Sequence, residues 1–387
     1  MKTIILFLVL TISLNAQNWE PLYQPEENRY FDLLSFEDNS FLLIYDSGLF
    51  KLYRTSDDGN TWKRIIERED KENKIKNFSK ASAISNDGSI FIPVGNEGEI
   101  IRVQVDPNSL LVSKLETTSI VNSIDMKDNE IGVACTDKEL FITSNSWNNS
   151  EKLEIENIKT VAYTGKAISY IKHSEELGTQ YYRSIDNGVT WDNSIISNIN
   201  PDKLYFTNDD IGFLIGKRVE EDIEGVVSYF DVIYKTTDSG ISWKMVLDNK
   251  KDDFTELIDI EMKGDLGIAS GLTQSIYITF DNGENWEHQT IDGLEDEKTL
   301  LTVCGFLNNR FLLAIRDKGI YSKLDPMLSV ESNTNEGIIV QNNVIKFRNT
   351  NVFEYELFGL DGNKLESGSI NTELDIEHLN SGTYFLR

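Results

Sequence analysis

Short apolar runs alternate with turn residues along most of the chain. Gly, Asn, Ser and Asp recur every few residues, and β-branched and aromatic side chains fill the intervals. Such a pattern is typical of an all-β protein. The first group of predicted strands is 30–36, 41–45, 48–56 and 61–66, and similar groups span 81–116, 119–153, 158–196, 202–247, 254–291 and 299–324.

A turn motif of the form Ser/Thr-x-Asp-x-Gly-x-Thr/Ser-Trp, here called the box, recurs before the last strand of several groups. Its aspartate can accept hydrogen bonds from nearby backbone amides, and its glycine supplies the positive φ that the turn needs. Its tryptophan opens the returning strand and can cover the turn. The four complete copies contain Asp57, Gly59 and Trp62; Asp186, Gly188 and Trp191; Asp238, Gly240 and Trp243; and Asp281, Gly283 and Trp286.

The box aspartates allow two interpretations. They could form a carboxylate or cation site, or each could satisfy the amides of its own loop. A turn that recurs at a fixed period marks a structural unit, so the second interpretation is favoured. We therefore predict structural turns and expect no catalytic, cofactor-binding or metal-binding residue among them.

Two other groups carry degenerate copies of the box. Residues 143–147 keep Trp147 in a shortened turn, and residues 105–108 keep turn chemistry without a tryptophan. The tryptophans from Trp147 to Trp286 stand roughly 40–50 residues apart, which is the period of four-stranded propeller blades. The groups together predict a seven-bladed β-propeller. Because the last group supplies only three strands, residues 19–23 are expected to close the ring as its missing strand.

Composition narrows the range of partners. The 387 residues include 64 acidic and 37 basic side chains, for a net charge of −27. Such a surface repels nucleic-acid phosphates and anionic lipids. Cys135 and Cys304 lie in apolar runs and are expected to be buried without a disulfide. The negative charge argues against a nucleic-acid partner. The three histidines lack metal-ligand spacing, so no metal or other cofactor is expected.

The first 16 residues have the pattern of a secretory signal peptide. Met1-Lys2 precedes an apolar run over 4–14, and cleavage is expected after Ala16. The run is too short to span a bilayer, and no later segment is apolar enough to do so. We therefore expect a secreted or cell-surface protein without a membrane span.

The boxes resemble the Asp-box (BNR) repeats of sialidases, sortilin-type receptors, xyloglucanases and the photosystem II stability/assembly factor family. The strand pattern and the number of blades are most similar to those of the photosystem II stability/assembly factor family. The resemblance covers about residues 19–325 and implies a propeller. It does not imply one activity, because these families share the box and differ in function.

Residues after Pro326 have a different character. The segment 358–364 reads as a strand, an Asp-Gly turn and a strand, and with 379–386 it resembles the type A C-terminal sorting domain of the type IX secretion system. That resemblance implies a small β-sandwich read by the secretion machinery. The usual Asn-Pro is absent, and the chain ends at Arg387 where members add a further strand, so sorting could be impaired. The predicted organisation is a signal peptide at 1–16, the propeller at 17–326, a linker at 327–336 and the sorting domain at 337–387.

Two functions remain open. A sialidase-like site would need three converging arginines, and the Arg-Ile-Pro motif that marks it is replaced here by Arg29-Tyr30-Phe31-Asp32. Boxes without catalytic signatures favour a non-catalytic module that binds an unknown protein or glycan at the propeller mouth. The alternative is a secreted glycoside hydrolase, sialidase- or xyloglucanase-like, with an unrecognised site. Clustered arginines, or paired carboxylates flanked by aromatic residues, would favour the enzyme.

Overall fold

The structure is a computed structural model of the 387-residue chain. It describes the backbone of residues 8–12, 18–24, 30–46, 49–69, 82–94, 97–105, 109–164, 166–196, 199–251, 254–273, 275–294, 302–308 and 310–324, and of the strands β30 to β35 near the C-terminus. Two compact units divide the chain. One is Pro21–Ser322, and the other joins Met1–Glu20 to Lys323–Arg387.

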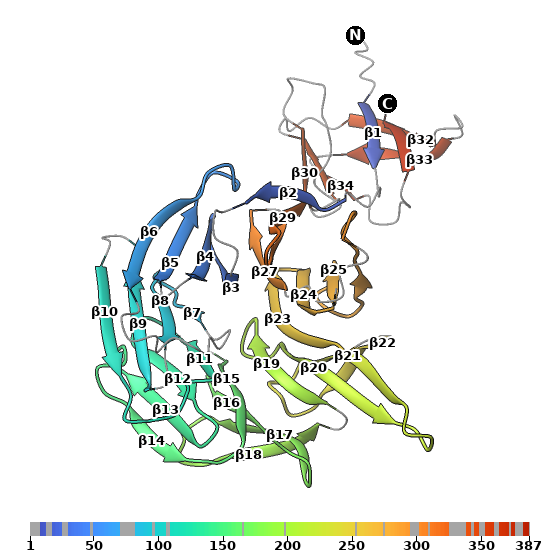
Figure 1. The fold of residues 1–387 in the computed structure, drawn as a ribbon. Coiled ribbons are helices and arrows are strands. Elements are labelled where there is room, and N and C mark those ends of the chain that lie inside the picture. The colour runs from blue at the N-terminus through green and yellow to red at the C-terminus, as the bar shows by residue number, and fades with distance from the viewer. Residues whose placement is uncertain are drawn as a thin grey trace. The chain divides into compact units, whose positions relative to one another are not determined.

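The larger unit is a ring of seven four-stranded antiparallel sheets, a β-propeller (Figure 1). The prediction of seven blades is confirmed. From the inner to the outer strand, blades 1 to 3 are β3 (Tyr30–Phe36), β4 (Asn39–Asp46), β5 (Leu49–Thr55) and β6 (Lys63–Glu69); β7 (Ala83–Ile84), β8 (Ile90–Val94), β9 (Glu99–Gln104) and β10 (Ser109–Lys114); β11 (Ser123–Met126), β12 (Ile131–Cys135), β13 (Glu139–Ser144) and β14 (Glu151–Glu154).

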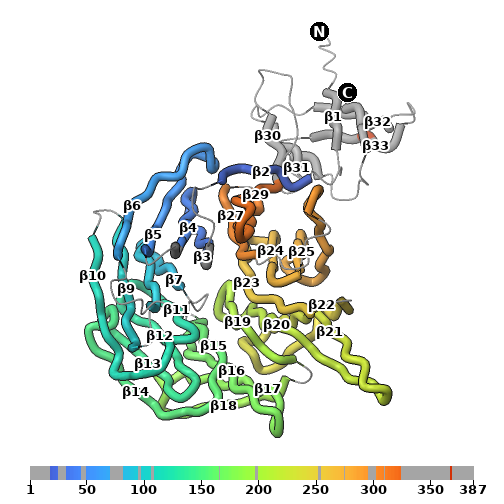
Figure 2. Tube along the Cα trace, in the orientation of Figure 1, coloured from blue at the N-terminus to red at the C-terminus, as the bar shows by residue number. Residues whose placement is uncertain are grey.

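The next three blades follow the same order. They are β15 (Ile158–Tyr163), β16 (Ile168–Ser174), β17 (Gly178–Ser184) and β18 (Asp192–Ile196); β19 (Asn200–Phe206), β20 (Gly212–Glu221), β21 (Val227–Thr236) and β22 (Lys244–Lys251); β23 (Glu256–Lys263), β24 (Leu266–Leu272), β25 (Ile276–Thr279) and β26 (Glu287–His288). The blades succeed one another round the ring in chain order (Figure 2).

Blade 7 joins the two ends of the ring. It takes β27 (Thr302–Leu307), β28 (Arg310–Ile315) and β29 (Gly319–Leu324) from the end of the propeller sequence, and β2 (Glu20–Tyr23) from its beginning. The expectation that an N-terminal strand closes the ring is therefore confirmed. Leu22 and Tyr23 on β2 pack on a buried cluster that combines blades 1 and 7, so closure also buries apolar surface.

The core lies between neighbouring blades. The buried clusters each combine side chains of two adjacent sheets, as when Phe41 and Phe50 of blade 1 pack with Ile92 and Ile101 of blade 2. Blade sheets therefore bury both faces, which explains why the middle strands read as continuous apolar runs: every residue of β8 is buried.

The smaller unit contains β1 (Leu8–Ile12), β30 (Ile338–Gln341), β31 (Val344–Phe347), β32 (Phe353–Gly359), β33 (Lys364–Ile370), β34 (Glu373–Asp375) and β35 (Gly382–Leu386). One sheet has the order β1-β35-β32-β33, and the other has β30-β31-β34. The linker expected at 327–336 lies outside the described residues. No helix long and apolar enough to cross a membrane occurs in the part of the chain that the structure describes.

Candidate functional site

The four complete boxes form one repeated backbone turn. The residue after the aspartate and the glycine that follows it both have positive φ in every copy. The pairs are Asp58 (57°) and Gly59 (80°), Asn187 (58°) and Gly188 (88°), Ser239 (61°) and Gly240 (85°), and Asn282 (56°) and Gly283 (78°). Two successive left-handed residues match the hairpin turn that the motif predicts.

Hydrogen bonds within each turn use both oxygens of its aspartate. In the blade 4 copy, Asp186 Oδ1 accepts the backbone N–H of Thr190 and the hydroxyl of Ser184, both at 2.8 Å, and Oδ2 accepts the Thr190 hydroxyl at 2.6 Å. These bonds lower the pKa of Asp186 to about 2. The same contacts recur around Asp57, Asp238 and Asp281. The box carboxylates thus serve their own turns.

The box glycines also lie where neighbouring blades meet. A Cβ on Gly240 of blade 5 would stand 2.3 Å from the Tyr181 ring of blade 4, and one on Gly283 of blade 6 would stand 2.4 Å from Phe213 of blade 5. Leu22 of the closing strand approaches Gly59 of blade 1 in the same way, at 2.4 Å. Each turn therefore needs glycine for close packing as well as for φ.

Blade 3 departs from the sequence prediction. Trp147 does not follow a shortened turn; it occupies the glycine place of a full-length one, with a φ of 65°. Its N–H donates to Thr143 Oγ1 at 3.1 Å, and Asn145 takes the part of the aspartate by accepting Asn149 N–H at 2.9 Å. The indole is buried among side chains of blades 2 and 3, including Phe91. In the complete boxes a side chain of the preceding blade packs on the glycine and fills the space between the two blades. In blade 3 the Trp147 indole fills that space instead.

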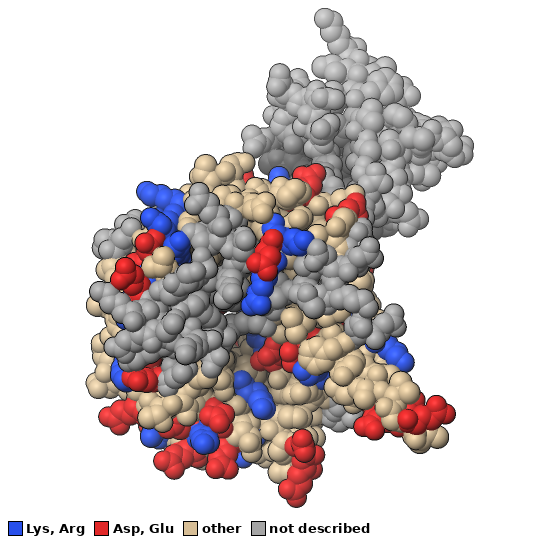
Figure 3. All heavy atoms as spheres, in the orientation of Figure 1, with Lys and Arg blue, Asp and Glu red and all other residues tan. Residues whose placement is uncertain are grey.

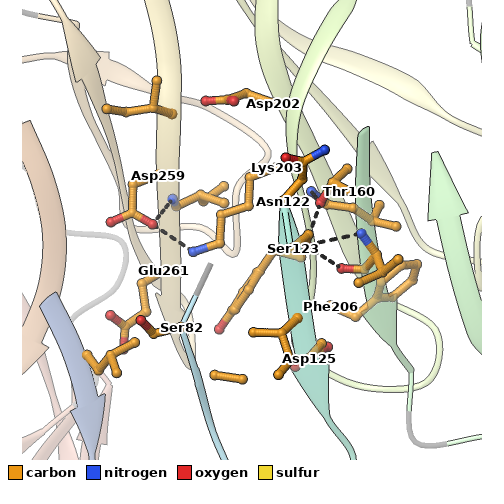
Figure 4. A pocket seen from close by; sticks show the side chains of 18 of the residues that line it. Ser82, Asn122, Ser123, Asp125, Thr160, Asp202, Lys203, Phe206, Asp259 and Glu261 are labelled. Carbon is orange, nitrogen blue, oxygen red and sulfur yellow. Dashed lines mark hydrogen bonds and ion pairs between the residues drawn. The ribbon is translucent and has the colours of Figure 1, made fainter. Parts of the chain in front are cut away.

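A cavity of about 620 Å³ lies at the centre of the ring. Its lining comes from β3, β7, β11, β15, β19 and β23, the inner strands of blades 1 to 6, with adjoining residues. Figure 4 shows carboxylates, a lysine and hydroxyls around this channel. Exposed Lys159 and half-buried Asn122, Tyr163 and Asp202 are among its polar lining groups.

Aspartates on the inner strands join successive blades. Asp125 of blade 3 accepts the N–H of Met126 on its own strand and that of Tyr163 on blade 4, both at 2.8 Å. Asp32 of blade 1 accepts Leu33 N–H at 3.0 Å and the N–H of Ser82, before blade 2, at 3.1 Å. Each aspartate satisfies a backbone amide of the next blade, which an inner edge would otherwise leave unpaired.

Asp259 of blade 6 has the same role and also pairs with a lysine. Its oxygens accept Ile260 N–H at 3.0 Å and Cys304 N–H of blade 7 at 2.9 Å, and Lys203 Nζ of blade 5 lies 2.7 Å from Oδ1. Burial opposes the charge on Lys203, but the charges of Asp259 and Asp32 outweigh it and raise its pKa. The ammonium therefore stays charged inside the channel.

The carboxyls on the inner strands have pKa values far above those of the boxes. Burial, with the charge of Asp259, raises the pKa of Asp32 to about 7, and burial raises that of Asp125 to about 6. Burial raises the pKa of Glu261 to about 8, against a hydrogen bond of 3.1 Å from the Ser35 hydroxyl of blade 1. Glu261 is the acidic group of the channel that is best placed to hold a proton at neutral pH.

The channel lacks the features of a sialidase site. None of its described lining residues is an arginine. Arg54 lies instead on blade 1, where its Nε donates to Asn39 at 2.9 Å, and Arg29 lies outside the described residues. Cys135 and Cys304 are buried free thiols. Nowhere in the described chain do three or more His, Cys, Asp or Glu residues gather so that they could hold a metal ion.

Sequence reasoning did not find the channel cluster. A signal was present, because ionisable residues stand among apolar ones on inner strands, as in Phe31-Asp32-Leu33-Leu34 of β3 and Ile258-Asp259-Ile260-Glu261 of β23. Attention to the first strand of each repeat would have identified these positions. The strongly acidic composition concealed them, since charged residues are frequent everywhere, for example at the tip of the β20–β21 hairpin (Figure 3).

Comparisons with known proteins show the fold alone. No family model and no curated protein matches the chain. Among solved structures it is similar to YCF48 bound to D1 peptide, with a TM-score of 0.53 and 15% identity over 82% of this chain and 97% of that one. It is also similar to the GH74 xyloglucanase of Xanthomonas campestris, with a TM-score of 0.55 and 11% identity over 81% of this chain and 55% of that one.

A third similar structure is PorZ, a surface component of the type IX secretion system of Porphyromonas gingivalis. The TM-score is 0.51 with 10% identity, over 94% of this chain and 57% of PorZ. This chain therefore spans little more than half of PorZ and of the xyloglucanase. The class of protein is a seven-bladed β-propeller.

Proposed function

We propose that this chain is a secreted or cell-surface, non-catalytic propeller that binds a protein or glycan segment at the mouth of its central channel. The observation that carries the proposal is the hydrogen bonding of three aspartates on the inner strands. Asp32, Asp125 and Asp259 each accept backbone N–H groups from two places, their own strand and the chain at the next blade. Carboxylates committed in this way join blades and are poorly suited to exchange protons with a substrate.

Half-exposed groups at the mouth are suited to recognition. Asn122 and Tyr163 offer an amide and an aromatic hydroxyl, and exposed Lys159 adds a positive charge to the lining. A few polar groups around a cavity of this size are typical of a ligand site. YCF48, a protein of similar fold, is described with a bound peptide, which supports a peptide as one class of ligand.

Binding to immobilised probes tests this proposal. The purified chain would be applied to an array of bacterial and plant glycans and to an array of extended peptides. Lys159→Glu reverses a charge in the channel lining and should weaken binding of any retained probe by about tenfold, as loss of a direct polar contact does. Lys138→Glu makes the same change on an exposed turn outside the channel lining and should have no effect. Absence of binding to both arrays would count against the proposal.

A glycoside hydrolase is the second candidate, favoured by one observation. Asp259 and Glu261 lie two residues apart on β23 and line the channel together with Tyr205, and the raised pKa of Glu261 suits a general acid. Activity on fluorogenic sialosides or β-glucans that Glu261→Gln abolishes would establish this function. Inactivity across both substrate panels would reject it.

We also propose that residues 1–16 are a secretory signal and that residues 337–387 are a type A sorting domain of the type IX system. The apolar run over 4–14 after Met1-Lys2 supports the signal, and the strand, Asp-Gly turn and strand pattern at 358–364 supports the sorting domain. Cell fractionation of a type IX host tests the export route. The full chain should reach the cell surface or medium, and a chain ending at residue 336 should stay in the periplasm. Equal export of both chains would refute the sorting role.

A further inference from the structure

The outermost strand of blade 2, β10, has an unusual surface. Leu110, Leu111 and Val112 follow one another along it and are 37%, 56% and 46% exposed. Successive side chains of a strand point to opposite faces, so three exposed neighbours mean that both faces of β10 are open to solvent. Its inner edge pairs with β9, and its outer edge has no partner strand in the described chain.

Other outer strands carry protection that β10 lacks. β6, β14 and β22 have several charged side chains each, β2 contains Pro21, and β26 has only two residues. Such features prevent an open edge from pairing with another chain. β18 exposes Ile195, but its neighbours Ser194 and Ile196 are half-buried and buried. β10 runs uncharged from Ser109 to Ser113, with Lys114 only at its end.

We propose that β10 is a dimerisation edge, at which two copies of this chain pair antiparallel to form a continuous eight-stranded sheet. The strand is complementary to itself. With a two-fold axis at Leu111, each Leu111 lies opposite Leu111 of the second copy, and each Leu110 lies opposite Val112. Each Ser109 then lies opposite Ser113, and Lys114 falls outside these pairs, so the two lysines do not meet. A self-complementary patch is what an isologous two-fold contact requires.

The same geometry limits the strength of the dimer. One strand of six residues buries less than the standard interface of about 1,600 Å², so a dissociation constant of roughly 10–100 μM is expected. The net charge of −27 on each copy opposes association at low salt. Because the contact itself is apolar and backbone-mediated, added salt should screen the repulsion and strengthen the dimer. Association through ion pairs would weaken instead.

Sedimentation of the full chain from about 1 to 500 μM tests the proposal, since this range brackets the expected constant. The double variant Leu111→Lys/Val112→Lys places like charges opposite each other and should raise the dissociation constant about tenfold or more. The matched control Leu177→Lys/Ile195→Lys adds the same charge at two exposed apolar positions of blade 4 and should dimerise like the wild type. A wild-type chain that stays monomeric overturns the proposal, and so does a dimer that the β10 variant leaves unchanged.

Hydrogen exchange of the unaltered chain locates the contact without any substitution. Exchange of the outward-pointing amides of β10 should slow as concentration rises, while amides in β6 and β14 should not change. Protection that rises with concentration at a different strand would place the contact elsewhere and refute the assignment. The channel takes no part in this edge, so the result is independent of the binding proposal.

Discussion

The box turns and the central channel use aspartate in the same way and with opposite electrostatic results. In both places carboxylate oxygens accept backbone N–H groups, as Asp186 does from Thr190 and Asp125 from Tyr163. The pKa of Asp186 is lowered to about 2, whereas that of Asp125 is raised to about 6. The difference is burial: water solvates the Asp186 carboxylate, whereas the Asp125 carboxyl is buried away from water. A hydrogen-bonding pattern therefore does not by itself determine the charge of the group.

The two regions also differ in what they stabilise. A box turn closes one hairpin and presents a flat glycine to the blade before it, while a channel aspartate joins the backbone of two blades. The stability of the box turns therefore depends on close packing, and that of the channel depends on the charge of its carboxyls. Substitutions that change one property and keep the other can separate these contributions.

Trp147→Gly should have the largest effect and tests the dependence on shape. It restores the glycine that the four complete boxes have at this place, and it removes the strain of a non-glycine residue at positive φ. It also empties a buried site between blades 2 and 3, which should destabilise the protein by about 3–5 kcal/mol. Denaturant unfolding measures the change. The control Asn187→Gly alters an exposed residue of similar φ and should change stability by less than about 0.5 kcal/mol. A stabilised Trp147→Gly protein would show that backbone conformation outweighs packing.

Gly240→Ala should follow, with a loss of about 2–3 kcal/mol from positive φ and overpacking together. The new methyl group would press on Tyr181, whose hydroxyl is held by hydrogen bonds to Ser169 and Ser239. Gly178→Ala is the matched control, because its φ of +70° is similar and no atom lies within 4 Å of the added carbon. That variant should lose only about 1 kcal/mol. Equal losses of stability in the two variants would show that close packing at Gly240 does not contribute.

Glu261→Gln tests the charge in the channel. A carboxyl whose pKa rises to about 8 on folding binds more protons when folded than when unfolded, so the wild type loses stability as pH rises from about 4.5 to 8. Glutamine cannot ionise and can still accept the Ser35 hydroxyl. Relative to the wild type, the free energy of unfolding of the variant should therefore rise by about 1–2 kcal/mol between pH 5 and 8. Thermal unfolding across this range measures the gap, and a gap that is independent of pH would contradict the assignment.

Asp238→Ala should have the smallest effect and the opposite pH dependence. Partial burial opposes the charge of Asp238, but hydrogen bonds from Ser242 and Thr236 lower its pKa. Loss of these bonds should cost about 1 kcal/mol at pH 7. The stabilisation exists above the unfolded pKa and is lost as pH falls through the folded one, so the variant and the wild type should converge below about pH 4. A deficit that persists undiminished in acid would show that the carboxylate charge is not its source.

Local patterns in the sequence determined the architecture of the ring. Strand alternation, the recurring Asp-x-Gly turn and the three-stranded last group predicted seven blades and the closing strand at 19–23, because these signals lie within a few residues of one another. The position of Trp147 was misread, since only the hydrogen bonds of Thr143 and Asn145 reveal which residue takes the place of glycine.

The channel was decided by the tertiary structure. Lys203 meets Asp259 from 56 positions away, and Ser35 reaches Glu261 from 226 positions away, because the ring brings the first strand of every blade to one axis. Burial at that axis then sets the protonation of Asp32, Asp125 and Glu261. A sequence records which residues can ionise. Distance from water, which only the closed ring creates, decides which of them do.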